Sequence, residues 1–352
     1  MSRIAVVTSS PPMTEGGHMV IARELVGALR EAGHAAEVIV TPQNRFGRQG
    51  SAYLATWLTD VGHGDGQRID QVISLRYPSY AVRHDHHVCW LNHTMREYYD
   101  LWGGFSATLS PQGLLKERVR RAAIHAADKY LLARNVDKLF VQSRTVQRRL
   151  AIWSQLTSTV LYPPAPRRPY RCEGYGDYVF MISRLTKEKR AELLIQALAT
   201  PEGAGIRAVI AGDGQERPHL EALINHHGMH DRVSLAGRLS DEAVLDHYAR
   251  CRAVVFPPVS EDYGFVTAEA FASRKPVVTC IDSGGPAELV IDGINGFVTE
   301  ANPSAMARAL RRLLDDPALA EQTGQAAFGA GQRLNWPETV KRLTSEDLKT
   351  AD

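Results

Sequence analysis

Two carboxylates eight positions apart, Glu261 and Glu269, stand in a stretch whose residue types can bind a phosphorylated ligand. Glu261 follows an apolar run at 253–258, which predicts a strand that ends in a loop. Gly264 precedes a second apolar run at 265–272, which predicts a helix. The first N–H groups of a helix have no partner within it and favour negative charge, so this corner is suited to an anion. Glu269 would lie one to two turns inside the helix at ~1.5 Å of rise per residue, within reach of a sugar hydroxyl. A surface Glu and a helical Glu with no shared role remain the alternative for these residues alone.

Two cations, Arg184 and Lys189, flank a loop between a predicted strand at 178–182 and a helix. Fixed cations at such a position can stabilise the negative charge of a phosphorylated ligand. Ordinary surface charges before a helix are the alternative. Two further predicted strands end in glycine turns that let a ligand approach the backbone. The first turn contains Gly212, and the second contains Gly237, Arg238 and Leu239.

The N-terminal half offers a glycine pair and a histidine at strand ends. Gly16 and Gly17 lie in the loop after a predicted strand at 3–9, and His93 follows a predicted strand at 87–91. The carboxyl ends of parallel strands are where open α/β sheets bind ligands. A flexible turn and a hydrogen-bonded structural histidine are the alternatives.

Alternating strands and helices in both halves predict two doubly wound α/β domains. A length of 352 residues favours two domains, and the Pro-, Arg-, Gly- and Tyr-rich stretch at 162–176 indicates the linker between them. The first strand–loop–helix lacks the G-x-G-x-x-G pattern of dinucleotide-binding proteins.

The predicted helix at 114–134 carries Leu115, Val119 and Tyr130 on one side and a row of Lys and Arg on the other. The basic row is either a solvated surface or a contact with an anionic membrane or acceptor. Nucleic acid is disfavoured because no base-stacking module or known binding motif occurs.

The remaining composition is that of an ordinary soluble globular protein. Four scattered cysteines indicate a reducing, cytoplasmic location, and no apolar run approaches the ~18 residues of a membrane span. Peripheral contact with the inner face of a membrane stays open. The run His84–His87 could suggest a metal site, but neighbours on an extended chain point in opposite directions, so a solvated turn is preferred.

The stretch around the two glutamates resembles the retaining glycosyltransferases of family 4, which have the GT-B fold. The motifs behind the resemblance are the Glu pair, a small-residue helix, a Gly-Gly-Pro-x-Glu turn and a D-G-x-x-G hairpin. The matching positions are Glu261, Glu269, Pro276, Gly284, Gly285, Glu288, Gly293 and Gly296. The resemblance implies two facing doubly wound parallel-sheet domains with a cleft between them. It assigns 1–162, with a crossover helix at 337–352, to the acceptor side and 163–336 to nucleotide-sugar binding.

The resemblance also implies a role for each candidate residue. Glu261 and His93 would face the donor hexose, and Arg184 and Lys189 would hold the diphosphate, although Ser183 and Arg190 replace two glycines of the family's motif there. The residues implied to contact phosphates, ribose or base are Gly16, Gly17, Gly212, Gly237, Arg238, Leu239, Gly264, Phe265, Val266 and Glu269.

The function so implied is transfer of a hexose from a UDP- or GDP-sugar to a hydroxyl of a glycan, a glycolipid or a small molecule, with retention of anomeric configuration. We expect no tightly bound cofactor and no metal, since no Asp-x-Asp dyad suited to a metal occurs. A nucleotide-sugar-binding subunit without turnover and another GT-B enzyme, such as a sugar-nucleotide epimerase, remain alternatives.

Overall fold

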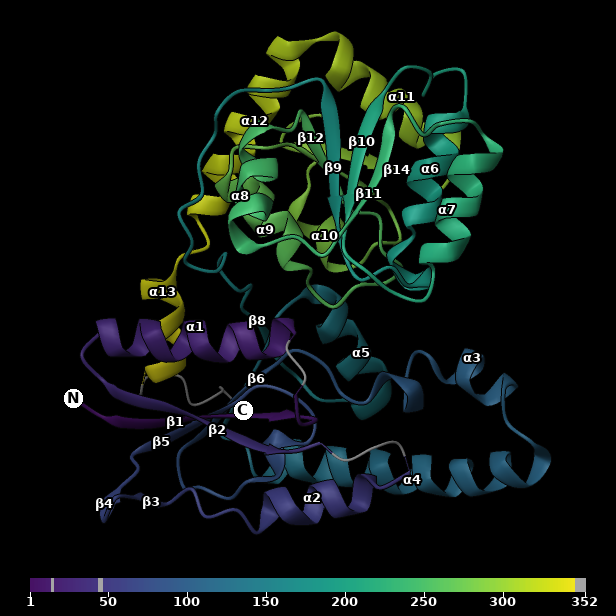
Figure 1. Cartoon of the computed structure of the whole chain (residues 1–352). Coiled ribbons are helices and arrows are strands. Elements are labelled where there is room, and N and C mark those ends of the chain that lie inside the picture. The colour runs from purple at the N-terminus through teal and green to yellow at the C-terminus, as the bar shows by residue number, and fades with distance from the viewer. Residues whose placement is uncertain (14–15, 44–46, 346–352) are drawn as a thin grey trace. The chain divides into compact units, whose positions relative to one another are not determined.

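The chain divides into two compact units in this computed structural model, which describes residues 1–13, 16–43 and 47–345 (Figure 1). Unit 1 comprises Met1–Pro163 and Trp336–Asp352, and unit 2 comprises Pro164–Asn335. Each unit contains a parallel sheet covered by helices, which confirms the predicted pair of doubly wound α/β domains. Residues 346–352, the end of the predicted crossover helix, lie outside the described ranges.

The sheet of unit 1 has the strand order β2-β1-β5-β6-β7-β8 over the described residues, and every neighbouring pair is parallel. All five residues of β6 are buried, as expected for a strand covered on both faces. The strands are β1 Arg3–Ser10, β2 Ala35–Pro42, β5 Gln71–Ser74, β6 His87–Leu91, β7 Lys138–Val141 and β8 Thr159–Val160, and a separate hairpin pairs β3 His63–Gly64 with β4 Gln67–Arg68.

The last helix of the chain, α13 (Trp336–Thr344), packs against α1 (Gly17–Glu31) and completes unit 1. Trp336 is buried and meets Trp90 of β6 edge to face, with ring centroids 6.4 Å apart. The other helices of unit 1 are α2 Gln49–Trp57, α3 Trp102–Ala107, α4 Pro111–Arg134 and α5 Arg144–Ser154, with short 3-10 turns at Ser79–Ala81 and Arg96–Tyr98.

Helix α4 presents to solvent the apolar side that its amphipathic pattern would bury. Leu115, Val119 and Tyr130 are 66–67% exposed. The opposite face buries two carboxylates, Glu117 and Asp128, beside Ile124 and Leu132. The apolar row therefore faces away from the core, because the partners of the buried face are polar.

Those partners are tyrosine hydroxyls from distant segments. Asp128 is fully buried and accepts hydrogen bonds from Tyr53, from Tyr80 at 2.5 Å and from Tyr99 at 2.6 Å. Burial raises the pKa of Asp128 to about 6, and the three hydroxyl donors oppose that rise. The Asp128 carboxylate and three tyrosine hydroxyls are thus hydrogen-bonded to one another beneath α4. This polar cluster, and not the apolar row of the helix, occupies the buried side of α4.

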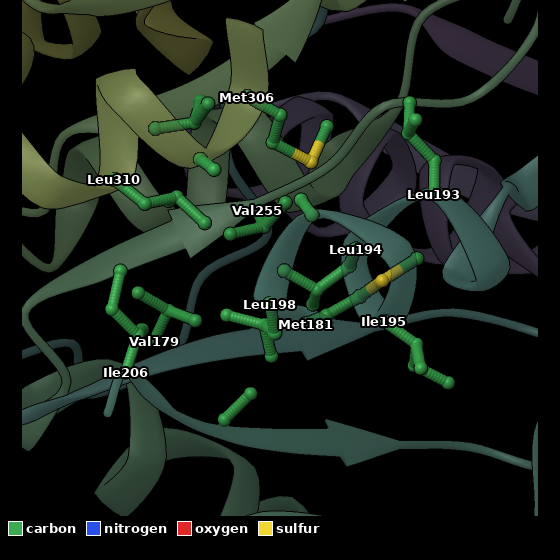
Figure 2. Packing of buried hydrophobic residues seen from close by; sticks show 14 of the residues in the cluster. Val179, Met181, Leu193, Leu194, Ile195, Leu198, Ile206, Val255, Met306 and Leu310 are labelled. Carbon is green, nitrogen blue, oxygen red and sulfur yellow. The ribbon is translucent and has the colours of Figure 1, made fainter. Parts of the chain in front are cut away.

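The sheet of unit 2 has the order β11-β10-β9-β12-β13-β14, again with parallel neighbours throughout the described residues. Alternate residues of β9 face opposite layers: Val179 and Met181 join one core cluster, and Phe180 joins the other. Figure 2 shows the first cluster, where leucines of α6 and α11 meet the sheet. The strands are β9 Tyr178–Ile182, β10 Arg207–Ala211, β11 Val233–Gly237, β12 Ala253–Val255, β13 Val277–Cys280 and β14 Gly296–Thr299.

Helices cover both faces of this sheet. Helices α6, α7 and α11 contribute to the first cluster, and α8, α9 and α12 contribute to the second (Figure 1). The bounds are α6 Ala191–Ala199, α7 Arg217–His226, α8 Asp241–Arg250, α9 Phe265–Ala272, α10 Gly285–Leu289, α11 Pro303–Asp315 and α12 Pro317–Gln332, with a 3-10 turn at Lys187–Lys189. Within the described ranges, no helix has both the length and the apolar character needed to cross a bilayer.

Candidate active site

Helix α9 begins in unit 2 at a glycine whose conformation other residues rarely adopt. Gly264 precedes α9 with φ +80°, and a Cβ there would lie 2.6 Å from the Phe256 ring. The Thr267 N–H donates to Gly264 O at 3.1 Å, so the Phe265 and Val266 amides come before the first hydrogen bond of the helix. The strand, the loop and the helix start predicted for this corner are therefore present, and anion binding there stays a prediction.

The backbone of Glu261 is fixed by the Gly284–Gly285 turn. Glu261 N–H donates to Ser283 O at 2.9 Å, and Gly285 N–H donates to Glu261 O at 2.9 Å. Gly284 has φ +72°, and a Cβ on it would overlap Glu261 O. The two glycines of the Gly-Gly-Pro-Ala-Glu motif thus have a physical role, since they allow the turn to lie against the residue that it orients.

Lys189 and Glu261 form a close ion pair. Lys189 Nζ lies 2.5 Å from Glu261 Oε2, and the two side chains are only 14% and 24% exposed. The ammonium also lies 5.6 Å from the centroid of the Phe256 ring. The structure therefore brings together three of the predicted elements: the cation, the carboxylate and the start of α9.

The second predicted cation, Arg184, lies just after β9 and is exposed. Among the described residues, no carboxylate forms an ion pair with it. Arg190 instead binds Asp282 at 2.6 Å. Arg190 replaces a glycine of the family's motif and adopts φ +52°, the left-handed conformation that glycine enters without strain. The loop thus keeps a glycine-like turn at this position despite the replacement.

The glycine turns after β10 and β11 meet through their backbones. Gly212 N–H donates to Gly237 O at 2.7 Å. Gly212 has φ +115°, and a Cβ there would overlap the carbonyl oxygen of Ser183 after β9. Three neighbouring strand ends therefore approach closely at the carboxyl edge of the sheet. Beyond this edge Arg238 is exposed and Leu239 is half-buried.

Glu269 is buried within α9, and both of its carboxylate oxygens have partners. The Tyr248 hydroxyl donates to Oε2 at 2.8 Å, the Tyr170 hydroxyl donates to Oε1 at 3.4 Å, and Arg168 Nη1 lies 3.8 Å from Oε1. Burial raises the pKa of Glu269, while the Tyr248 hydrogen bond and the charge of Arg168 oppose that rise. No sequence pattern indicated these three partners.

The candidate residues of unit 1 also lie at the carboxyl edge of their own sheet. Gly16 precedes α1 in an extended conformation, and Gly17 is the first residue of that helix. His93 follows β6, is half-buried, and its Nδ1 lies 2.7 Å from Thr94 O. Because a carbonyl oxygen only accepts, this contact places the proton of the neutral ring on Nδ1.

Within the described residues, no group of three or more His, Cys, Asp and Glu side chains is arranged to hold a metal ion. The run at 84–87 folds locally instead: both ring nitrogens of His84 contact backbone carbonyls, of His86 at 3.1 Å and of Ile69 at 3.0 Å.

Comparison with known proteins places this geometry in context. Residues 169–329, all within unit 2, match the family model described as glycosyl transferases group 1. The alpha-D-kanosaminyltransferase of Streptomyces kanamyceticus is 38% identical over 168 residues, which cover 46% of this chain and 43% of that protein. The chain therefore spans less than half the length of this relative.

Solved structures match along almost the whole chain. The sucrose-phosphate synthase of Thermosynechococcus elongatus has a TM-score of 0.75 at 18% identity, and the match covers 97% of both chains. The Anabaena protein HepE, solved in complex with UDP and glucose, has a TM-score of 0.71 at 19% identity, and the match covers 99% of this chain and 100% of that one. The whole chain thus shares the fold of these proteins, and the part of unit 2 that carries the Lys189–Glu261 pair is similar to group 1 glycosyl transferases.

Proposed function

We propose that the chain is a glycosyltransferase that moves a hexose from a nucleotide-diphosphate sugar, a UDP- or GDP-sugar, to an acceptor hydroxyl. The observation that carries this proposal is the Lys189–Glu261 pair beside the glycine-led start of α9, within the segment that matches group 1 glycosyl transferases. The HepE complex with UDP and glucose and the name of the kanosaminyltransferase support a sugar nucleotide as the donor.

In this proposal unit 2 binds the donor. Lys189 and Arg184 neutralise the diphosphate together with the amides that open α9. Glu269 accepts hydrogen bonds from the ribose hydroxyls, since a buried carboxylate needs donors in order to stay charged. The turns at Gly212 and at Gly237, Arg238 and Leu239 receive the base and the ribose. Residues 163–336 would then form the nucleotide-sugar-binding domain.

The reaction breaks the bond between the anomeric carbon and the diphosphate oxygen and forms one from that carbon to the acceptor oxygen. The leaving phosphate takes the acceptor proton on the same face of the sugar, which gives retention without a covalent enzyme intermediate. Glu261 orients the hexose and Lys189 stabilises the charge that develops on the diphosphate. Residues 1–162, with the C-terminal helix, would supply the acceptor side, where Gly16 and Gly17 approach the donor phosphates and His93 faces the hexose.

The acceptor is proposed to be a glycan, a glycolipid or a small molecule, and the surface of α4 favours one held at an anionic membrane. Apolar side chains of α2 and α4 line a groove of about 700 Å³, with Lys116 and Arg120 among its lining residues. Exposed apolar residues beside cations are typical of helices that lie in the interface of a bilayer. In this proposal unit 1 contacts the inner face of a membrane peripherally.

A donor panel tests the enzymatic proposal directly. Purified protein is incubated with UDP- and GDP-hexoses and candidate acceptors, and release of UDP or GDP is measured together with the anomeric configuration of the product. Acceptor-dependent release with a retained anomer supports the proposal. Tight nucleotide binding without release in any mixture would instead identify a binding subunit that lacks turnover.

A further inference from the structure

The two oxygens of the Glu269 carboxylate differ in how firmly their partners are held. Oε2 accepts from Tyr248, which is fully buried in the core between α8 and the sheet. Oε1 has only a long hydrogen bond from Tyr170 and an ion pair with Arg168 at 3.8 Å. Both Oε1 partners belong to residues 164–177, here called the strap, in which the structure has no helix or strand. Oε1 is thus the oxygen whose partners can be exchanged.

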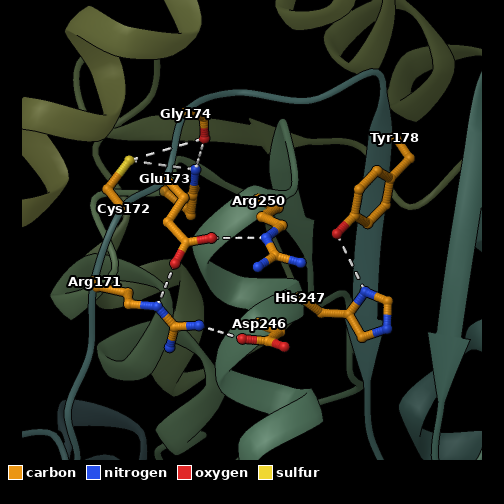
Figure 3. Close-up of polar contacts among 9 residues, drawn as sticks. Arg171, Cys172, Glu173, Gly174, Tyr178, Asp246, His247 and Arg250 are labelled. Carbon is orange, nitrogen blue, oxygen red and sulfur yellow. Dashed lines mark hydrogen bonds and ion pairs between the residues drawn. The ribbon is translucent and has the colours of Figure 1, made fainter.

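The strap is firmly anchored after Tyr170 (Figure 3). Arg171 pairs with Glu173 at 2.6 Å and with Asp246 of α8, and Glu173 pairs with Arg250 at 2.7 Å. The buried Lys275 donates to the carbonyl oxygen of Gly174. Arg168 also lies 3.5 Å from Asp241 of α8, so it keeps an acidic partner when it leaves Oε1. Because the contacts above hold the strap from Arg171 onward, a movement of Arg168 and Tyr170 can be confined to this part of the strap.

A buried carboxylate without donors is costly, by roughly 1–3 kcal/mol or more for each unsatisfied charged group. If Tyr248 were the sole donor to Glu269, Oε1 would have no partner in the absence of ligand and the carboxylate would be destabilised by that amount. Arg168 and Tyr170 supply the missing positive charge and hydroxyl. Their chemistry, a hydroxyl donor at one carboxylate oxygen, is also what a ribose would offer.

We propose that Arg168 and Tyr170 are placeholders for the ribose of the donor. They occupy Glu269 Oε1 in the empty protein, and the ribose hydroxyls displace them when a nucleoside diphosphate binds. This inference rests on the proposed function and deepens it, because it makes the conformation of the strap a direct response to donor binding. It also means that part of the donor's binding energy is spent on removing an internal competitor.

The test measures the affinity of UDP and GDP for the full chain by titration calorimetry, using wild type, Tyr170→Phe, Tyr170→Phe with Arg168→Gln, and Tyr248→Phe. Removing the competitor tightens binding, so we expect the affinity to rise about threefold in Tyr170→Phe and up to about tenfold in the double variant. Tyr248→Phe is the matched control, because it removes the same hydroxyl from the other oxygen and weakens binding instead. Thermal unfolding of each variant checks that the fold is retained.

Analogues of UDP and GDP that lack both ribose hydroxyls distinguish two explanations for tighter binding by the variants. One is loss of a competitor for the ribose hydroxyls, and the other is a general change in the shape or charge of the site. Because an analogue without hydroxyls cannot replace the strap at Oε1, it should bind the double variant no more tightly than it binds wild type. As a second readout, hydrogen exchange of a peptide covering 165–170 should accelerate on addition of UDP or GDP, while the start of α9 slows.

Weaker binding of the parent nucleotide to Tyr170→Phe would overturn the placeholder, because Tyr170 would then be a ligand contact. An analogue that gains as much affinity as the nucleotide does in the double variant would overturn it as well, while transfer activity would leave the proposed function standing. If no nucleoside diphosphate binds wild type and no sugar nucleotide is consumed, the proposed function fails and the placeholder falls with it.

Discussion

Lys189 Nζ lies 2.5 Å from Glu261 Oε2, so the cation and the carboxylate of the candidate site neutralise each other when no ligand is bound. A diphosphate would draw the ammonium toward itself and leave the carboxylate to accept hydrogen bonds from the hexose. In the proposed mechanism the pair would therefore link the two halves of a sugar nucleotide through one contact.

Glu261→Gln separates the role of the carboxylate from nucleotide binding. The amide keeps the side chain's size but loses its charge, so we expect transfer to fall by at least about a hundredfold. Nucleotide affinity should stay within about tenfold of wild type. Steady-state kinetics and calorimetry check both values, and unchanged turnover would remove Glu261 from the mechanism.

Lys189→Met tests the cation. We expect nucleoside diphosphate affinity and turnover to fall together, since the diphosphate is bound in the ground state and becomes more negative as it leaves. Arg207→Met is the matched control: Arg207 forms an exposed pair with Asp177 at the other end of β10, and such surface pairs contribute little. A loss of equal size in the control would show a general charge effect.

Gly212→Ala should destabilise the protein by about 1–3 kcal/mol, because the new Cβ would meet the carbonyl oxygen of Ser183 at a positive φ. Gly329→Ala is the control. Gly329 lies in the exposed part of α12, and a Cβ added there would have no neighbour within 4 Å, so alanine should stabilise by up to about 1 kcal/mol. Denaturant unfolding measures both, and equal changes would contradict the assigned crowding.

The double variant Leu115→Ser, Val119→Ser should reduce the fraction of protein that co-sediments with vesicles containing anionic lipid. Both side chains are exposed on α4 beside basic residues. Ile294→Ser, at an exposed isoleucine of unit 2, should have no effect.

Charge reversal at Arg118, Arg120 and Arg121 should also weaken binding to these vesicles. Arg118 is the cleanest choice, because Arg120 pairs with Glu117 and the Arg121 guanidinium lies near the rings of Trp102 and Trp153. Absence of wild-type binding to these vesicles would refute the membrane contact.

The buried Asp128 should make stability depend on pH. Its folded pKa is raised from 3.8 to about 6, so the folded state binds more protons than the unfolded state between these values. The contribution is most favourable below pH 4, is lost as the pH rises through 6, and is constant above. Over that window it amounts to about 3 kcal/mol. The difference between wild type and Asp128→Asn in urea unfolding at several pH values should show this slope, and a pH-independent difference would contradict it.

The elements around the site could be predicted because they depend on local patterns. The apolar runs at Tyr178–Ile182 and Phe265–Ala272 are β9 and α9, with the predicted bounds. Fully buried parallel strands and small-residue helices are visible as continuous apolar segments.

What the sequence could not indicate depends on non-local partners. The buried face of α4 is set by Asp128, whose donors Tyr53, Tyr80 and Tyr99 are 29–75 positions away. The periodicity of α4 describes only its own residues, so it does not show which face is buried. Arg168 and Tyr170 were missed for the same reason, because their Pro- and Arg-rich surroundings indicated only a linker.

The edge-to-face contact of Trp336 with Trp90 has a consequence for synthesis of the chain. The ribosome makes the sheet of unit 1 first, then all of unit 2, and only afterwards the helix that covers Trp90. The part of the first-made sheet around Trp90 therefore lacks its contact with α13 throughout translation of the second unit. A nascent chain stalled just before Trp336 should be more sensitive to protease in unit 1 than in unit 2, and a supplied α13 peptide should reverse that difference.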